Sequence, residues 1–197
     1  MNSTPSLIKL SNELILASGS PRRKMLLQDL GLDFKVKTVS FDESFPEDMP
    51  TEKVAEYLAT GKNEANREKC KDEIVLTADT VVVFNDRILG KPSTEGEAIS
   101  TLKLLSGKVH QVTTGVCISS GEKRVSFSST TKVKFQELTE DEIIAYVKNL
   151  KPMDKAGSYA IQEWIGLIGI EWIEGSYFNV VGLPVHDVYR ILKEDFS

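Results

Sequence analysis

The sequence predicts an α/β fold, and three observations support that prediction. Two short apolar runs, residues 13–17 and 74–78, have the length and the continuous hydrophobicity of buried strands. Between them, from Thr51 onward, apolar residues recur at helical spacing. The chain has 197 residues, of which 41% are hydrophobic and 27% charged, as in ordinary globular proteins. We therefore expect residues 1–197 to form one compact unit with a single sizeable core.

Turn and cap residues define the elements of the first half of the chain. After the first strand, Ser20 can cap a helix whose first residue is Pro21, and Gly31 is placed to end it. Residues 34–39 alternate at period two, like a half-exposed strand. The strand 74–78 is expected to end at Asp79, where the apolar run stops.

The second half of the chain contains clear helix starts and two long strand segments. A hairpin of residues 81–84 and 88–89 is expected around Asn85-Asp86, and a helix with a capping box of Thr94 and Glu97 then runs to about Leu105. Antiparallel strands follow over 111–119 and 123–135, joined at Ser120-Gly121. The next helix, over 143–149, has a capping box of Thr139 and Glu142. Residues 159–173 fit either a strand or a buried helix, and Pro184 is well placed as the first residue of a final helix.

Composition excludes several classes of protein. A net charge of -5 argues against non-specific binding to nucleic acid or to anionic lipid, since neither polyanion is attracted by a negative field. The most apolar window, residues 164–173, contains Glu171 and is too short to span a bilayer, so we expect a cytoplasmic protein without membrane contact. Cys70 and Cys117 have neither CxxC spacing nor nearby histidines, which argues against disulfides and zinc sites.

A turn with the sequence SGSPRR, residues 18–23, follows the first strand and can bind an anion. Ser20 as the cap and Pro21 in the first helical turn leave backbone N–H groups free at the positive end of the helix dipole. Arg22 and Arg23 add planar, permanently charged groups suited to phosphate oxygens. The turn by itself also fits a capped helix with solvated arginines, and it is neither a Walker loop nor a dinucleotide fingerprint.

Acidic residues at two places can supply metal ligands or a general base. Asp79 is expected at the end of an apolar strand, which is where open α/β sheets bind ligands. In the acidic loop over 41–50, either Asp42 or Glu43 can supply a second oxygen, since magnesium takes one or two carboxylates and completes its shell with phosphates and water. Asp79 also fits a plain turn residue, and most acidic loops are merely solvated.

Other polar residues are weaker candidates when taken singly. Lys91 is fixed between Gly90 and Pro92, and Lys62 projects from a helix with other lysines, so both also fit solvated cations. Gln162 carries an amide that can complement the adjacent donor and acceptor of uracil or thymine, although a surface or core glutamine is the commoner case. His110 and His186 have no partners at motif spacing, and we assign them no role.

Five separated motifs together are more specific than any one of them. They read LASGSPRR, LTADTVV, LGKP, MDKAGSYAIQ and NVVGLP, and in order and spacing they resemble the Maf family of nucleoside triphosphate pyrophosphatases over almost the whole chain. The resemblance implies a mixed, elongated α/β sheet with flanking helices and two lobes around a cleft, similar to inosine triphosphate pyrophosphatases, within one domain of residues 1–197 and often as a homodimer. It implies cleavage between the α and β phosphates of a nucleoside triphosphate, with Mg²⁺ or Mn²⁺.

The resemblance also implies roles for individual residues. Asp79 matches the family's proposed general base and, with Glu43, a metal ligand. The residues that match phosphate-holding positions are Ser18, Arg23, Lys62 and Lys91. Arg22, Thr80 and Gln162 match the branch that prefers dTTP and UTP over methylated guanine nucleotides. The sequence departs from the family after Gln162, because residues 164–172 are bulkier than the glycine-rich start that the family has there. Such bulk would narrow the base pocket.

Two other functions compete with pyrimidine triphosphate hydrolysis. The family name is associated with septum inhibition, so the chain could bind a nucleotide to regulate cell division without significant catalysis. A housekeeping enzyme for damaged purines such as inosine triphosphate would share the fold and the cleavage but have a different base pocket.

Overall fold

The computed structural model describes residues 7–67, 69–70 and 72–197, and these group into two compact units. The first unit comprises the chain up to Asp79, Thr114–Ser129 and Gly182–Ser197, and the second comprises Thr80–Thr113 and Thr130–Val181. Three of the four boundaries fall within long strands, which therefore contribute residues to both units, and the fourth follows Val181. Folding as one domain of residues 1–197 stays a prediction.

The strands belong to one mixed sheet, as the fold class requires. The seven strands of the described residues are β1 (Leu14–Leu16), β2 (Phe34–Val36), β3 (Ile74–Phe84), β4 (Arg87–Leu89), β5 (Val109–Ser120), β6 (Lys123–Phe135) and β7 (Ile170–Glu174). Their order is β2-β1-β3-β5-β6-β7, with β4 paired to β3. β1 pairs in parallel with both β2 and β3, whereas β3–β4 and β6–β7 are antiparallel.

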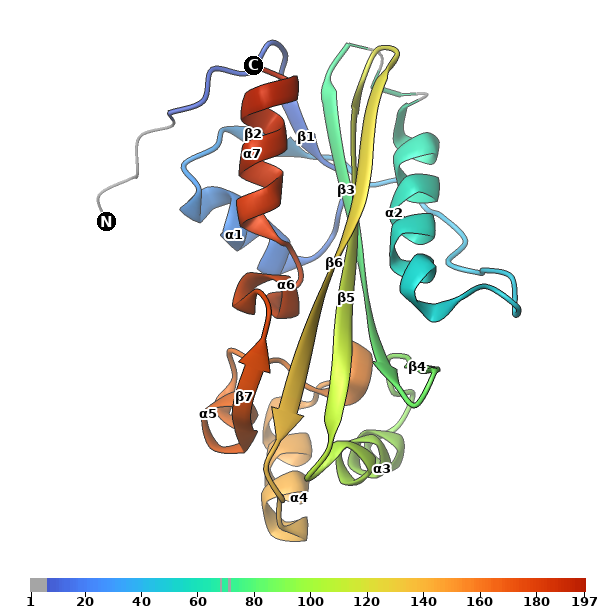
Figure 1. Ribbon diagram of the computed structural model, residues 1–197, viewed down its shortest axis with the longest axis vertical. Helices are drawn as coiled ribbons and strands as arrows, with labels where there is room; N and C mark the ends of the chain where they lie inside the picture. The colour runs from blue at the N-terminus through green and yellow to red at the C-terminus, as the bar shows by residue number, and fades with distance from the viewer. Residues whose placement is uncertain (1–6, 68, 71) are drawn as a thin grey trace. The chain divides into compact units, whose positions relative to one another are not determined.

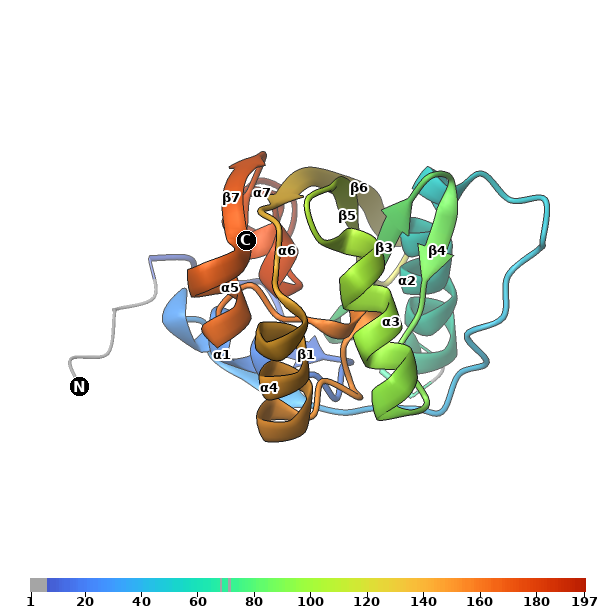
Figure 2. The same cartoon turned by 90° about the horizontal axis from the view of Figure 1, so that it is seen from below.

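Three helices flank the strands of the first unit: α1 (Pro21–Asp29), α2 (Thr51–Arg67) and α7 (Val185–Asp195). α2 lies on one side of β3 and β5, and α1 and α7 lie on the other (Figures 1 and 2). The Asn63 side chain of α2 donates hydrogen bonds to the backbone oxygens of Val75 on β3, at 3.0 Å, and of Cys117 on β5, at 3.3 Å. A buried amide with backbone partners fixes the position of α2 along these strands.

The second unit holds the remaining helices: α3 (Glu95–Leu105), α4 (Glu140–Leu150), the short 3₁₀ helix η1 (Ala156–Ser158), α5 (Trp164–Gly169) and α6 (Tyr177–Val181). α3 and α4 pack against each other near the ends of β5 and β6 (Figures 1 and 2). Thr139 and Glu142 form the predicted capping box of α4. Thr94 caps α3, but the Glu97 carboxylate accepts from the N–H of Ser93 rather than from that of Thr94.

Most expected elements are confirmed, and several differ in detail. β2 covers only Phe34–Val36 of the strand expected over 34–39. β3 does not end at Asp79 but continues to Phe84, because the Val-rich residues after Thr80 are also buried strand. Residues 159–173 contain both α5 and β7, so neither single alternative is right. Pro184 is the N-cap of α7 rather than its first residue. Asn85 and Asp86 adopt positive φ angles of 50° and 57°, as the predicted hairpin turn requires.

Among the described residues, no helix combines the length and the apolar character that crossing a membrane would require.

Candidate functional site

The SGSPRR turn builds one side of a polar cluster in the first unit. Ser20 caps α1 by accepting a hydrogen bond from the N–H of Arg23 at 3.4 Å, and Pro21 stands in the first helical turn, as predicted. The Ser18 hydroxyl oxygen accepts from the N–H of Ser20 at 3.3 Å and from Arg23 Nη1 at 3.2 Å. This hydroxyl therefore ties the start of the helix to the guanidinium of Arg23.

Arg23 is also held from the carboxyl-terminal part of the chain. Its Nε donates to the backbone oxygen of Gly182 at 2.8 Å. Gly182 lies in the NVVGLP motif and has a φ angle of 130°, in the region that favours glycine. The sequence alone assigns this motif no role. In the structure, the backbone oxygen of its Gly182 accepts the hydrogen bond that orients Arg23.

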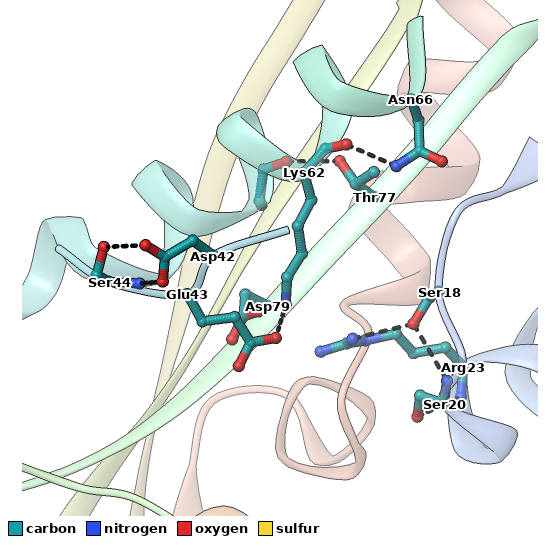
Figure 3. A network of polar contacts seen from close by, with 11 residues as sticks. Ser18, Ser20, Arg23, Asp42, Glu43, Ser44, Lys62, Asn66, Thr77 and Asp79 are labelled. Carbon is teal, nitrogen blue, oxygen red and sulfur yellow. Dashed lines mark hydrogen bonds and ion pairs between the residues drawn. The ribbon is translucent and has the colours of Figure 1, made fainter. Parts of the chain in front are cut away.

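Lys62 links the two candidate carboxylates. Its Nζ lies 2.6 Å from Oε1 of Glu43 and also contacts Oδ2 of Asp79 (Figure 3). The Lys62 and Asp79 side chains are 18% and 14% exposed, whereas Glu43 is 53% exposed. Lys62 and Asp79 thus form a largely buried ion pair. Glu43 contacts the same ammonium from the solvent side, and because Glu43 is solvated its attraction to Lys62 is weaker.

The local geometry explains why this lysine meets Asp79. Alternate residues of a strand share a face, so Asp79 lies on the same face of β3 as Thr77. The Thr77 hydroxyl donates to the backbone oxygen of Ala59 on α2 at 2.7 Å, which shows that this face is turned toward α2. Lys62 follows Ala59 by three residues and is therefore on the same side of the helix. Helical spacing alone could not distinguish it from Lys53 and Lys69.

The loop of residues 41–50 contributes Glu43 rather than Asp42. Both carboxylate oxygens of Asp42 accept from Ser44, one from its N–H at 3.1 Å and one from its hydroxyl at 2.9 Å. Asp42 therefore stabilises the loop itself, while Glu43 reaches Lys62. Of the two carboxylates that the sequence offered, Glu43 is the one that contacts Lys62 together with Asp79.

The charges of Asp79 and Glu43 act on the guanidinium of Arg23. Burial lowers the pKa of Arg23, and the nearby Asp79 carboxylate opposes that shift. Arg22 lowers the same pKa further, and Glu43 raises it. Arg23 extends from α1 toward Asp79 (Figure 3), so the first unit brings together two cations and two carboxylates beside a helix start. Such a cluster can bind phosphate oxygens, which prefer guanidinium and ammonium groups.

The described residues include no group of three or more His, Cys, Asp and Glu side chains that would make a complete protein metal site. Magnesium needs only one or two carboxylates and takes its other ligands from phosphates and water. Glu43 and Asp79 both contact the same ammonium nitrogen, so their oxygens are close enough to share one cation. The two residues fit a divalent ion that binds together with a triphosphate.

The other predicted residues are exposed or part-buried. Thr80 follows Asp79 on β3 and is partly buried, and Lys91 is exposed just beyond β4. Gln162 is exposed and directly follows the buried residues 157–161. These three belong to the second unit, whereas Ser18, Arg22, Arg23, Glu43, Lys62 and Asp79 belong to the first.

One buried cation of the second unit was missed by sequence reasoning. Lys155 lies in the MDKAGSYAIQ motif, where the sequence assigns it no role, and its side chain is only 9% exposed. Its Nζ lies 2.7 Å from Oδ1 of Asp154 and 3.3 Å from Oε1 of Glu163. The small residues that follow Lys155 allow close packing here, although that signal does not identify its partners.

Comparisons with known proteins agree with the motifs. The chain is 50% identical over 185 residues to the "dTTP/UTP pyrophosphatase" of Christiangramia forsetii, covering 93% of this chain and 94% of the relative. It is 49% identical to the protein of the same name in Phocaeicola vulgatus, covering 92% and 95%. The Staphylococcus aureus Ham1 protein aligns with a TM-score of 0.44 and 16% identity, over 62% of this chain and 71% of that one. The model of the family described as "Maf-like protein" matches residues 13–195, and the chain therefore belongs to the Maf family.

Proposed function

We propose that the protein is a nucleoside triphosphate pyrophosphatase that hydrolyses dTTP and UTP to the nucleoside monophosphate and pyrophosphate. The names of relatives about half identical over more than nine-tenths of both chains support the substrate. The observation that carries the chemistry is the pairing of Lys62 with Asp79 and Glu43 beside Arg23. This cluster combines cations that can bind phosphate oxygens with a partly buried carboxylate, Asp79, that can accept a proton.

The reaction requires a water molecule in line with the α-phosphorus and neutralisation of the charge on the departing pyrophosphate. In the proposed mechanism, Asp79 accepts the proton of that water. Arg23 and Lys62 stabilise charge on the phosphate oxygens, with Ser18 fixing the guanidinium. Lys91 is proposed as a further phosphate contact.

A divalent cation, Mg²⁺ or Mn²⁺, is proposed to be held by Glu43 and Asp79. When bound, such an ion neutralises phosphate charge and lowers the pKa of a coordinated water. Lys62 pairs with the same two carboxylates, so the protein's own residues hold the acidic oxygens close together.

Base preference is proposed to depend on Gln162, with Arg22 and Thr80 as supporting positions. A glutamine amide can donate to the O4 of thymine or uracil and accept from N3–H. Cytosine presents the opposite order of donor and acceptor, so a fixed amide discriminates between them.

Pyrophosphate release from dTTP, UTP, CTP, ITP and 7-methyl-GTP, with and without Mg²⁺ or Mn²⁺, tests the proposal. Metal-dependent release that is greatest for dTTP and UTP is expected. Activity on another base alone would retain the chemistry and discard the role of Gln162. Absence of release from every triphosphate would favour a nucleotide-binding regulator of cell division. A homodimer and a cytoplasmic location stay predictions.

A further inference from the structure

Gln162 lies on a short turn and is exposed, whereas the two residues before it are buried. The N–H of Glu163 donates to the backbone oxygen of Ala160 at 3.0 Å, which closes residues 160–163 into a turn. Ala160 and Ile161 are buried, and Gln162 is exposed. The backbone of this turn therefore determines the position from which the Gln162 side chain extends.

The phenol of Tyr146 on α4 joins the two ends of that turn. Its hydroxyl donates to Oε2 of Glu163 at 2.5 Å and accepts from the N–H of Ala160 at 3.3 Å. The Tyr146 side chain is 1% exposed. Burial first, and the Glu163 carboxylate second, raise the pKa of Tyr146, so the phenol keeps the proton that it donates.

The second carboxylate oxygen of Glu163 also has a partner, Lys155. Oε1 lies 3.3 Å from the buried ammonium of Lys155, which also pairs with Asp154. Glu163 is the N-cap of α5, yet its side chain makes no capping hydrogen bond. Its carboxylate contacts Tyr146 and Lys155 instead, so the tertiary contacts replace the usual local cap.

The other side of the turn is confined by α5. A Cβ added to Gly166 would lie 1.8 Å from the backbone oxygen of Ile161, so only glycine permits this approach. The N–H of Gly166 donates to the backbone oxygen of Glu163 at 2.9 Å. The turn is therefore held between α4 and α5, within the second unit.

Base discrimination by an amide requires the amide to lie at hydrogen-bonding distance from the base, and the backbone from which the side chain extends determines that distance. We propose that Tyr146, Lys155 and Glu163 act as positioning residues that hold the 160–163 turn and thereby maintain the base preference exerted through Gln162. This inference rests on the proposed function, because it takes Gln162 to be the residue that reads the base.

The test compares kcat/KM for dTTP with kcat/KM for dCTP in the full chain. This ratio is independent of the fraction of folded enzyme, so a loss of active protein alone does not move it. Gln162→Ala is expected to lower the ratio about 10-fold, the effect of one or two hydrogen bonds. Tyr146→Phe and Glu163→Gln are expected to lower it about 3- to 10-fold. Lys155→Met provides a third variant if either of these fails to fold.

Epistasis separates positioning from a general structural effect. In a Gln162→Ala background, Tyr146→Phe is expected to leave the ratio unchanged, because no amide remains to be positioned. Glu140→Gln is the matched control, since it removes an exposed ion pair with Lys103 (2.6 Å) in the same unit without touching the turn.

The outcomes distinguish the inference from the function on which it rests. If Gln162→Ala lowers the ratio but Tyr146→Phe and Glu163→Gln do not, the positioning role is wrong and the base-reading role stands. The positioning role is equally wrong if Tyr146→Phe lowers the ratio by the same factor with and without Gln162. An unchanged ratio in Gln162→Ala would instead overturn base reading, and the inference with it.

Discussion

The ammonium of Lys62 on α2 contacts the carboxylate of Asp79 on β3, and this ion pair is the centre of the candidate site. The contact exists because Thr77, two residues before Asp79, turns its face of β3 toward α2 through a hydrogen bond to Ala59. A substitution at either member therefore changes both the chemistry and the local charge balance.

Asp79→Asn is expected to lower kcat by at least about 100-fold, because an amide cannot accept the proton of the attacking water. Binding of a non-hydrolysable triphosphate analogue is expected to change only a few-fold. Asp42→Asn, in the neighbouring acidic loop, is the control and is expected to keep its activity, because Asp42 hydrogen-bonds Ser44. Substantial turnover by Asp79→Asn would remove Asp79 from the role of base.

Lys62→Met is expected to raise the affinity for Mn²⁺ in the absence of nucleotide, since the ammonium competes with a cation for Glu43 and Asp79. The same change is expected to lower the free energy of unfolding by about 1–3 kcal/mol, because the partly buried Asp79 loses its partner. Calorimetric titration with Mn²⁺ and urea denaturation measure the two effects.

Lys37→Met is the matched control for the lysine change. It removes an exposed ion pair with Glu73 (3.2 Å) in the same unit. Because solvent screens this pair, neither the Mn²⁺ affinity nor the free energy of unfolding is expected to change measurably in this variant. An unchanged Mn²⁺ affinity in Lys62→Met would show that Glu43 and Asp79 do not form the metal site.

Much of the fold follows from local signals in the sequence. Capping residues such as Thr94 and Thr139 identify helix starts because they satisfy backbone N–H groups without help from the rest of the chain. The end of β3 could not be placed in this way. Asp79 interrupts the apolar pattern but stays in the strand, because its charge is matched by Lys62 from another element.

The candidate site was predictable as a set of residues but not as a set of contacts. The first motif identified Arg23 and the family resemblance identified Lys62, whereas the hydrogen bond from Arg23 to the carbonyl of Gly182 and the contact of Glu43, rather than Asp42, with Lys62 depend on tertiary geometry. Lys155 was overlooked because a lysine in a polar stretch is expected to be solvated. Its burial becomes apparent only when Glu163, eight residues away, is brought beside it.

His110 is expected to make stability depend on pH. Burial lowers its pKa from 6.5 to about 4, with Nε2 bonded to the Tyr159 hydroxyl at 2.7 Å and the ring packed against Phe135. The unfolded chain therefore binds more protons between pH 6.5 and 4, so the stabilisation is present above pH 6.5 and is lost as the pH falls. From pH 7 to 5 the expected loss is about 2 kcal/mol.

Urea denaturation of the wild type and of His110→Gln at pH 5, 6 and 7 measures this contribution. Glutamine keeps a polar partner for Tyr159 but does not titrate, and carboxylates elsewhere affect both proteins equally. The difference in unfolding free energy between the two proteins is therefore expected to shrink toward pH 5. A constant difference across this range would show that His110 titrates at its ordinary pKa.

Gly115 on β5 is expected to be irreplaceable, because α2 passes directly over it. A Cβ at this position would lie 2.2 Å from the backbone of Ala55, which cannot move without displacing the helix that carries Lys62. Gly115→Ala is expected to cost about 3 kcal/mol or more in unfolding free energy. Gly96→Ala on α3 is the control: its added Cβ meets only Thr94 Oγ1 at 3.8 Å, so it is expected to stabilise the protein by about 0.5–1 kcal/mol. Equal melting temperatures for the two variants would contradict the close packing of α2 on β5.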